Sequence, residues 1–457
     1  MGFDGERASY EPLKKLIMNE QNADFLKRIK VREDSPQFFE SISQKLIRQE
    51  SLESNSNQQP DLIIAIDGGR EEVPILTGFP SASYGYVTVS SVLMDLKKIS
   101  ELEKEPFPNP IEVRNTETSV GIYTTFPGCN VFENDNEEPK AFLRRRLFEE
   151  LQNHNSFENG ESVLQTYEYL LDKRLQNNER EQKCPISGYE NCKIELQKGK
   201  FICPHSSQTL YSTDALRIYE NMKQDGSNLG IFTQIMSMLE KLWLVNILRS
   251  FEQRNWLSTL RRVAFIVDGP LAVFDTAAWL SQYIGEEVGR LNKKQKEING
   301  QDLIIVGLEK SGNFVEHFER LDINQSGDSE RFPSGSAFLL DNDYIKQNIQ
   351  FSTSTEPYGK ATYFGRKFFY KTASGQRLVP VVASYSANER DILTAEISQF
   401  SRLKDIMQLL DKLISSRYPN SITPLISAHA QAAIPQMGQK LFEDLAREIR
   451  ERDINNV

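Results

Sequence analysis

Four short apolar runs along the chain predict buried strands. They cover residues 62–66, 263–267, 303–306 and 378–382, and polar or turn-forming residues follow them. Runs of this length that stop at Gly, Pro or Asp are typical of strands inside a sheet. Residues 84–94 are rich in β-branched and aromatic side chains and partly alternate, so we expect a further strand or hairpin there.

Other segments have the spacing of helices. Residues 1–55 alternate charged and apolar positions before a polar run, which predicts helices and then a linker. Residues 130–182 are highly charged and helical in pattern, and residues 230–251 are apolar on nearly every side, as in a buried helix. Towards the C-terminus the pattern predicts a helix over 391–418, a loop, and a second helix over 436–453.

Strands mixed with helices favour an α/β or α+β fold over a helical bundle. At roughly 100 to 200 residues per domain, a chain of 457 residues holds several domains or one large α/β domain with insertions. We expect an N-terminal helical segment (1–60), the first part of the sheet core (61–130), an inserted helical arm with a cysteine hairpin (131–225), and the second part of the core with C-terminal helices (226–457).

The composition is that of a soluble globular protein. Hydrophobic residues make up 39% and charged residues 26%, which argues against a disordered or collagen-like chain. The net charge of −10 argues against general polyanion binding, so any nucleic-acid site must be local. No window approaches 18 uninterrupted apolar residues and the N-terminus is polar, so we expect a cytoplasmic protein that does not associate with membranes.

Two predicted strands end in the same way. Asp67 closes the run IIAID, Asp268 closes FIVD, and glycine follows each. If the strands are neighbours that end at the same edge of a sheet, the two carboxylates lie side by side, and a proton or a divalent cation relieves their repulsion. Oxygen ligands of this kind suit Mg²⁺ and Mn²⁺. The alternative is that each Asp-Gly pair simply makes a turn.

A third carboxylate follows from helix geometry. The strand 263–268 is about 20 Å long at roughly 3.3 Å per residue. On an antiparallel helix that ends near Gln253, the position level with Asp268 lies about 13 residues back at about 1.5 Å per residue, which is Glu240. Glu240 is the only acid in the apolar stretch IMSMLEKLWLV, and a buried carboxylate needs a partner or a metal. The alternative is a surface residue paired with a neighbouring cation.

One histidine and a cysteine segment are further candidates. His429 lies among small apolar residues in PLISAHAQAAIP, where it is either a satisfied buried residue or a catalytic one. The pattern C-P-x6-C-x10-C-P-H places Cys184, Cys192, Cys203 and His205 within a short segment. It predicts a hairpin with structural Zn²⁺, or a zinc-free form of the same hairpin, because zinc ribbons normally carry closer cysteine pairs.

A basic and aromatic strand is the candidate nucleic-acid contact. Arg366, Lys367 and Lys371 alternate with aromatic residues in YFGRKFFYK, which suits a strand that follows a phosphate backbone and stacks on bases. A strand with one solvated basic face explains the pattern equally well. The chain has no G-x4-G-K-[ST] motif, so it should not hydrolyse ATP by itself.

These motifs, in this order, resemble the NurA nuclease family. The resemblance spans about 60–435. It rests on IAIDGG around Asp67, MLEKLWLV around Glu240, FIVDGP around Asp268, GLEKSG around Lys310, and the Tyr418-Pro419 pair with the Ala-His of His429. The cysteine insertion and the long intervals between Glu240 and Asp268 and between Tyr418 and His429 depart from the family pattern.

The resemblance implies an RNase H-like mixed sheet flanked by helices, a homodimer, and degradation of DNA with Mn²⁺ or Mg²⁺. It implies 5′ to 3′ exonuclease activity with some single-strand endonuclease activity, in partnership with the hexameric ATPase HerA. By this resemblance Asp67, Glu240, Asp268 and His429 are catalytic, Tyr418 is accessory, and Lys310 contacts DNA. The competing hypotheses are a catalytically silent adaptor of the translocase and a nucleotide-binding ATPase of the same broad fold.

Overall fold

The computed structural model describes residues 10–29, 36–53, 59–75, 79–98, 117–133, 137–323, 331–385, 390–415 and 421–433. The chain divides into two units, Met1–Lys45 and Leu46–Val457. The first unit contains three helices, α1 (Glu11–Met18), α2 (Glu20–Arg28) and α3 (Pro36–Ser43). Asn19 caps α2, since its side chain accepts a hydrogen bond from the backbone N–H of Gln21 at 2.9 Å. Helices were expected in this segment.

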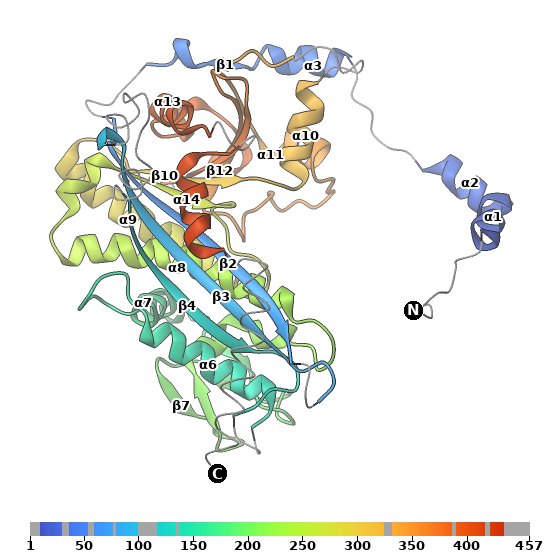
Figure 1. The fold of residues 1–457 in the computed structure, drawn as a ribbon, viewed down its shortest axis with the longest axis vertical. Coiled ribbons are helices and arrows are strands. Elements are labelled where there is room, and N and C mark those ends of the chain that lie inside the picture. The colour runs from blue at the N-terminus through green and yellow to red at the C-terminus, as the bar shows by residue number, and fades with distance from the viewer. Residues whose placement is uncertain are drawn as a thin grey trace. The chain divides into compact units, whose positions relative to one another are not determined.

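The second unit is built around a mixed sheet of nine strands (Figure 1). Its order is β1-β11-β12-β13-β10-β9-β2-β3-β4, in which β10, β9 and β2 are parallel and the other neighbours are antiparallel. The strands are β1 (Ile47–Arg48), β2 (Leu62–Pro74), β3 (Ser83–Asp95), β4 (Glu117–Pro127), β9 (Val263–Asp268), β10 (Ile304–Glu309), β11 (Ser336–Leu339), β12 (Gly365–Lys371) and β13 (Arg377–Ala383). The mixed α/β fold and the apolar runs predicted as strands are confirmed.

Helices cover both faces of this sheet. The larger apolar core combines one face with α6 (Pro139–Asn153), α7 (Val163–Gln176), α8 (Leu229–Gln253) and α9 (Leu280–Asn299). The second core combines the opposite face with α13 (Leu403–Leu413) and α14 (Thr423–Ala432). Shorter helices are α10 (Asn313–Asp322), α11 (Asn342–Asn348) and α12 (Arg390–Leu393). Because α6 and α7 contribute to the larger core, the segment expected as a helical arm packs onto the body of the fold.

The apolar helix α8 lies in the centre of this core. It is long and apolar enough to cross a membrane, but 83% of its most apolar window is buried inside the protein. Trp243 and Leu244 are completely buried, as are residues on the other sides of the helix. The prediction of a buried helix over residues 230–251 is therefore confirmed.

Three predictions of local structure are wrong. Asp67-Gly68-Gly69 does not end its strand, because β2 continues to Pro74 in register with β3. The helix expected over 391–418 is broken into α12, a 3-10 turn at Ile397–Gln399 and α13, with Arg402 in the left-handed region at φ 56° before α13. The loop expected after it contains α14, which has Pro424 in its first turn. The helix expected over 436–453 lies outside the described residues.

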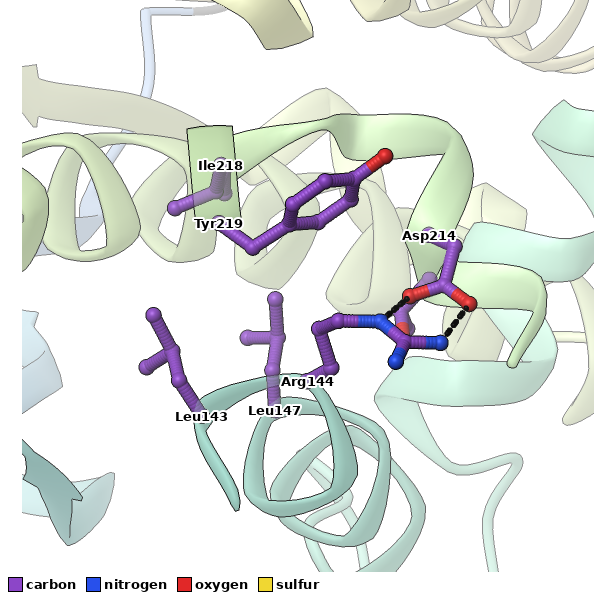
Figure 2. Close-up of a pocket in the computed structure, with 7 residues that line it drawn as sticks. Leu143, Arg144, Leu147, Asp214, Ile218 and Tyr219 are labelled. Carbon is purple, nitrogen blue, oxygen red and sulfur yellow. Dashed lines mark hydrogen bonds and ion pairs between the residues drawn. The ribbon is translucent and has the colours of Figure 1, made fainter. Parts of the chain in front are cut away.

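Two small hairpins lie between α7 and α8. They are β5 (Glu181–Lys183) with β6 (Lys193–Glu195), and β7 (Lys200–Ile202) with β8 (Thr209–Tyr211). The chain then passes through the 3-10 turns η2 (Ser212–Leu216) and η3 (Ile218–Asn221). Here Asp214 pairs with Arg144 of α6 beside a small cavity lined by Leu143, Leu147, Ile218 and Tyr219 (Figure 2).

Candidate active site

The central pair of parallel strands brings two carboxylates together. The parallel register of β2 and β9 ends at Ile66 and Val267, so Asp67 and Asp268 are the next residues on adjacent strands. Asp67 is 1% exposed, whereas the side chain of Asp268 at the strand end is 29% exposed. Alternation along the strands turns both side chains towards the face covered by α13 and α14, opposite to Ile66 and Val267.

Glu240 approaches from the other face of the sheet. It lies on α8, is 3% exposed, and its Oε2 accepts a hydrogen bond from Nζ of Lys241 at 2.6 Å. The same ammonium donates to the backbone carbonyl oxygen of Asp268 at 3.2 Å, so α8 places Glu240 level with the end of β9, as the helix geometry predicted. Lys241, 1% exposed, is a site residue that the sequence reasoning missed, although a lysine inside an apolar helix was a visible signal.

Two glycines after Asp67 allow helices to approach the strand. A Cβ on Gly68 would lie 2.6 Å from Cγ of Met236 and 2.7 Å from Oε1 of Glu240. A Cβ on Gly69 would collide with the backbone oxygen of Ala432, the last residue of α14, and would lie 2.7 Å from Oγ1 of Thr88. The glycines therefore serve close packing and not a turn.

Two basic groups flank the aspartates. Nζ of Lys310, which follows β10, lies 2.6 Å from Oδ1 of Asp268 and 4.0 Å from Oδ2 of Asp67. Nδ1 of His429 lies 3.1 Å from Oδ2 of Asp67, and the histidine side chain is 61% exposed. His429 is held there because the end of α14 is fastened to the sheet by the Thr88 hydroxyl, which donates to the Ala432 carbonyl at 2.5 Å. The histidine is therefore neither buried nor isolated.

Burial of the carboxylates changes their acidity. Burial and, to a smaller extent, repulsion from Asp268 raise the pKa of Asp67 to about 7, against the opposing charge of Lys310. Burial likewise raises the pKa of Glu240 to about 7, although the ion pair with Lys241 lowers it. Carboxylates so strongly perturbed within one site are a physical indication of function.

The arrangement fits a divalent cation in its charge and donor chemistry. Oδ1 of Asp268 is buried, and the ammonium of Lys310 stands 2.6 Å from it as a counter-ion in the position that a cation would take. Within the described part of the chain no three His, Cys, Asp or Glu side chains converge as a ready ligand set. Asp67 and Asp268 share one face, and Glu240 lies on the other face, with its Oε1 beside Gly68, the residue that follows Asp67.

The predicted DNA-contact strand is only partly available to a ligand. Lys371 is 0% exposed and pairs with Asp322 at 2.8 Å. Lys367 is 5% exposed and pairs with Glu309 at 2.6 Å, its ammonium 3.4 Å from the centre of the Phe314 ring. Both side chains point into the protein, which corrects their expected role at a DNA surface.

Arg366, Tyr418 and the cysteine segment are the remaining predicted site residues. Arg366 is partly buried and donates to the backbone oxygen of Thr394. Tyr418 lies outside the described residues. Cys184, Cys192, Cys203 and His205 belong to the β5–β8 hairpins and contribute nothing to the carboxylate site.

Two carboxylates on adjacent parallel strands, a third acid on a neighbouring helix and flanking basic groups are the arrangement found in carboxylate-centred hydrolases and metal-binding proteins built on a mixed sheet. The sequence model of the NurA domain matches residues 61–434, which is most of the chain. The chain belongs to the NurA domain family.

Solved structures of the same family give weak overall alignments. The crystal structure of the NurA nuclease from Sulfolobus solfataricus aligns with 11% identity and a TM-score of 0.32, covering 97% of each chain. A crystal structure of NurA with manganese aligns with 12% identity and a TM-score of 0.27, covering 97% of this chain and 99% of that one. Scores this low do not position individual residues. No curated protein matches the chain.

Proposed function

We propose that this protein is a divalent-metal-dependent deoxyribonuclease. The observation that carries the proposal is the placement of Asp67 and Asp268 on adjacent parallel strands, with Glu240 on the helix beside Gly68 and the pKa values of Asp67 and Glu240 raised by burial. We assign an RNase H-like core to β4, β3, β2, β9 and β10, an antiparallel unit that continues into two parallel strands. Family membership and the manganese in a relative's structure support the assignment.

In this proposal Asp67, Asp268 and Glu240 hold Mn²⁺ or Mg²⁺. The cations, when bound, supply activation of water and stabilisation of the leaving oxygen in phosphodiester cleavage. Lys310 offsets the negative charge of the two aspartates. Its side chain is one-third exposed, so its ammonium can also contact a phosphate of the bound DNA. His429 orients the Asp67 carboxylate through Nδ1 and presents an exposed ring edge that transfers or positions a proton on the substrate.

We further propose the setting in which the enzyme acts. It is a 5′ to 3′ exonuclease with single-strand endonuclease activity, works in the cytoplasm as a homodimer with a HerA-type hexameric ATPase, and processes DNA ends or degrades foreign DNA. The net charge of −10 and the absence of a Walker motif support such a partner, since a translocase would supply the DNA affinity and the ATP-driven step.

A second candidate is a catalytically silent adaptor of the same translocase. One observation favours it: Lys310 and Lys241 already pair with the acids of the site, so the carboxylates have counter-ions without any metal. Metal-induced stabilisation of the protein would count against the adaptor, because a lysine-neutralised site has no need of a cation.

Asp268→Asn tests the enzyme proposal. We expect the wild-type protein to degrade end-labelled linear duplex or single-stranded DNA in Mn²⁺, alone or with the ATPase, and the variant to lose more than about 100-fold of this activity, since outer-shell changes alone cost 10- to 100-fold. Equal activity in both proteins would place the catalytic site elsewhere. No activity in the wild type under either condition would leave the adaptor as the better description.

Gly69→Ala tests the role of His429. The new Cβ would displace the end of α14, and with it His429, while leaving the carboxylates in place. We expect a loss of activity on the order of 10²-fold, the scale of one general acid or base, with unchanged stabilisation by Mn²⁺. Gly230→Ala is the matched control, because nothing lies within 4 Å of its Cβ position. Full activity in Gly69→Ala would remove His429 from the mechanism.

A further inference from the structure

Ser90 on β3 carries a buried hydroxyl that the proposed mechanism does not use. The residue is 0% exposed, and its Oγ has no hydrogen-bond partner among the described residues. A buried donor without a partner is unfavourable, and nearly all such groups in folded proteins are paired. The position of Ser90 on the sheet indicates which group its hydroxyl serves.

The strand register places Ser90 beside Asp67. β2 and β3 are antiparallel, and Ser90 lies directly opposite Asp67. Residues paired in this way point to the same face of the sheet, with Cβ atoms roughly 4.5–5.5 Å apart. Val92, two residues further along β3, belongs to the core formed with α13 and α14, so Ser90 faces that side as Asp67 does. A rotation of the Ser90 side chain is enough to bring its hydroxyl to the Asp67 carboxylate.

The strands on either side of β3 leave Asp67 as the acceptor. Of the two residues directly opposite Ser90, Asp67 and Gly121, only Asp67 has a side-chain acceptor. Thr88, the preceding residue on the same face of β3, is committed elsewhere, because its hydroxyl donates to the Ala432 carbonyl at 2.5 Å. The two neighbouring hydroxyls of β3 are therefore divided between the end of α14 and the carboxylate site.

A hydrogen bond from Ser90 complements the contacts that Asp67 already makes. Oδ2 of Asp67 lies 3.1 Å from Nδ1 of His429 and 4.0 Å from Nζ of Lys310. Asp268 lies on β9, which is on the opposite side of β2 from β3. A donor on β3 therefore approaches the carboxylate from the side away from Asp268. It restricts rotation of the carboxylate and adds no charge to the site.

We propose that Ser90 is a positioning residue of the carboxylate site. Its hydroxyl donates to the Asp67 carboxylate and fixes the orientation in which Oδ2 faces His429 and Lys310. Because Ser90 is completely buried, it does not contact DNA and acts only through Asp67. This inference rests on the proposed nuclease function.

Ser90→Ala in the full-length protein tests the inference. We expect kcat for DNA cleavage in Mn²⁺ to fall about 10-fold, as for other groups that orient a metal ligand, and KM for DNA to stay within about twofold. The affinity for Mn²⁺, titrated without DNA, should fall by a similar factor, because a carboxylate that rotates freely is a poorer ligand. A purely structural role of Ser90 would instead lower the Tm in chelator and leave kcat and the Mn²⁺ affinity unchanged.

Thr124→Val is the matched control. Thr124 on β4 also has a buried hydroxyl without a partner among the described residues. It lies on the opposite face of the sheet, since Ile122 and Phe126 on either side of it belong to the core formed with α8. Valine has nearly the same shape, so this variant loses only the hydroxyl and should keep the wild-type kcat and Mn²⁺ affinity.

The outcomes separate the inference from the function on which it rests. An active wild type with a Ser90→Ala variant of equal kcat and equal Mn²⁺ affinity would overturn the role of Ser90 and leave the nuclease proposal intact. Equal losses in Ser90→Ala and Thr124→Val would also overturn it. A wild type that neither cleaves DNA nor binds Mn²⁺ would overturn both. If Ser90→Ala does not fold, Ser90→Cys decides, because cysteine has a similar shape and only a weak donor, so it should show the same loss.

Discussion

Replacing Asp67 by asparagine is expected to stabilise the metal-free protein above neutral pH and, in the same variant, to abolish the proposed DNA cleavage. The Asp67 carboxyl is almost completely buried beside Asp268, and this burial raises its pKa to about 7. Ionisation of Asp67 without a metal therefore opposes folding. Asparagine has nearly the same shape and carries no charge, so it removes the repulsion together with the metal ligand.

Asp67 is expected to lower the free energy of unfolding of the metal-free protein as pH rises. Below the ordinary aspartate value of 3.8 the carboxyl is protonated in both the folded and the unfolded chain, and Asp67 contributes no pH dependence. Between 3.8 and about 7 the unfolded chain releases the proton and the folded chain keeps it, so the free energy of unfolding falls as pH rises. Above about pH 7 the penalty is complete, on the order of 4 kcal/mol.

Denaturant unfolding with a chelator at about pH 4 and about pH 8 measures this effect. The variant should match the wild type at the lower pH and exceed it at the higher pH. With Mn²⁺ the wild type should gain stability and the variant should not. Glu158→Gln is the control, because it neutralises an exposed carboxyl. A variant less stable than the wild type at the higher pH, or equally stabilised by Mn²⁺, would contradict the metal-site assignment.

Replacing Arg144 by methionine is expected to lower the free energy of unfolding by about 3–5 kcal/mol. Arg144 and Asp214 form a bidentate ion pair with both N–O distances at 2.7 Å, and their side chains are 3% and 0% exposed (Figure 2). Asp214 also accepts the backbone N–H of Tyr211 at 2.9 Å. Methionine fills similar space but leaves a buried carboxylate without its counter-charge, which accounts for the size of the effect.

An exposed ion pair provides the matched control. Arg217 pairs with Glu220 at 2.7 Å with side chains 47% and 30% exposed, so Arg217→Met should cost about 1 kcal/mol or less. Adding Asp214→Asn to Arg144→Met should recover part of the loss, because it removes the uncompensated charge. Urea unfolding of the three variants measures both effects. Equal losses in Arg144→Met and Arg217→Met would show that the buried pair is not a special determinant of stability.

The positions of the three carboxylates could be predicted from local sequence, but the full length of the strand that carries Asp67 could not. Asp67 and Asp268 could be predicted as neighbours because each lies at the end of an apolar run. When the two runs pair as parallel strands in this register, the residues at their ends become adjacent. Glu240 could be located because rise per residue is nearly constant in helices and strands, so lengths can be compared. The continuation of β2 beyond Asp67 could not be predicted, since Asp-Gly-Gly has the local preferences of a turn and only pairing with β3 overrides them.

The basic strand illustrates the opposite case. The alternation in YFGRKFFYK correctly indicated a strand but not which face is solvated. Lys367 and Lys371 are buried because Glu309 and Asp322, distant in sequence, provide carboxylates within 3 Å of their ammonium groups. Lys241 and Glu240 are adjacent in sequence, yet both stay buried because the carbonyl of Asp268 offers the ammonium a second partner.

The sequence by itself determined the mixed α/β class, the strands that carry the aspartates, the buried helix that carries Glu240, and the family of the chain. These follow from periodicity and short motifs, which depend on neighbours along the chain. Only the tertiary structure decided that Asp67 and Asp268 share one face with His429 and that Glu240 packs against Gly68 from the other face. Such contacts join segments hundreds of residues apart, and long-range packing and electrostatics, not local preference, set their geometry.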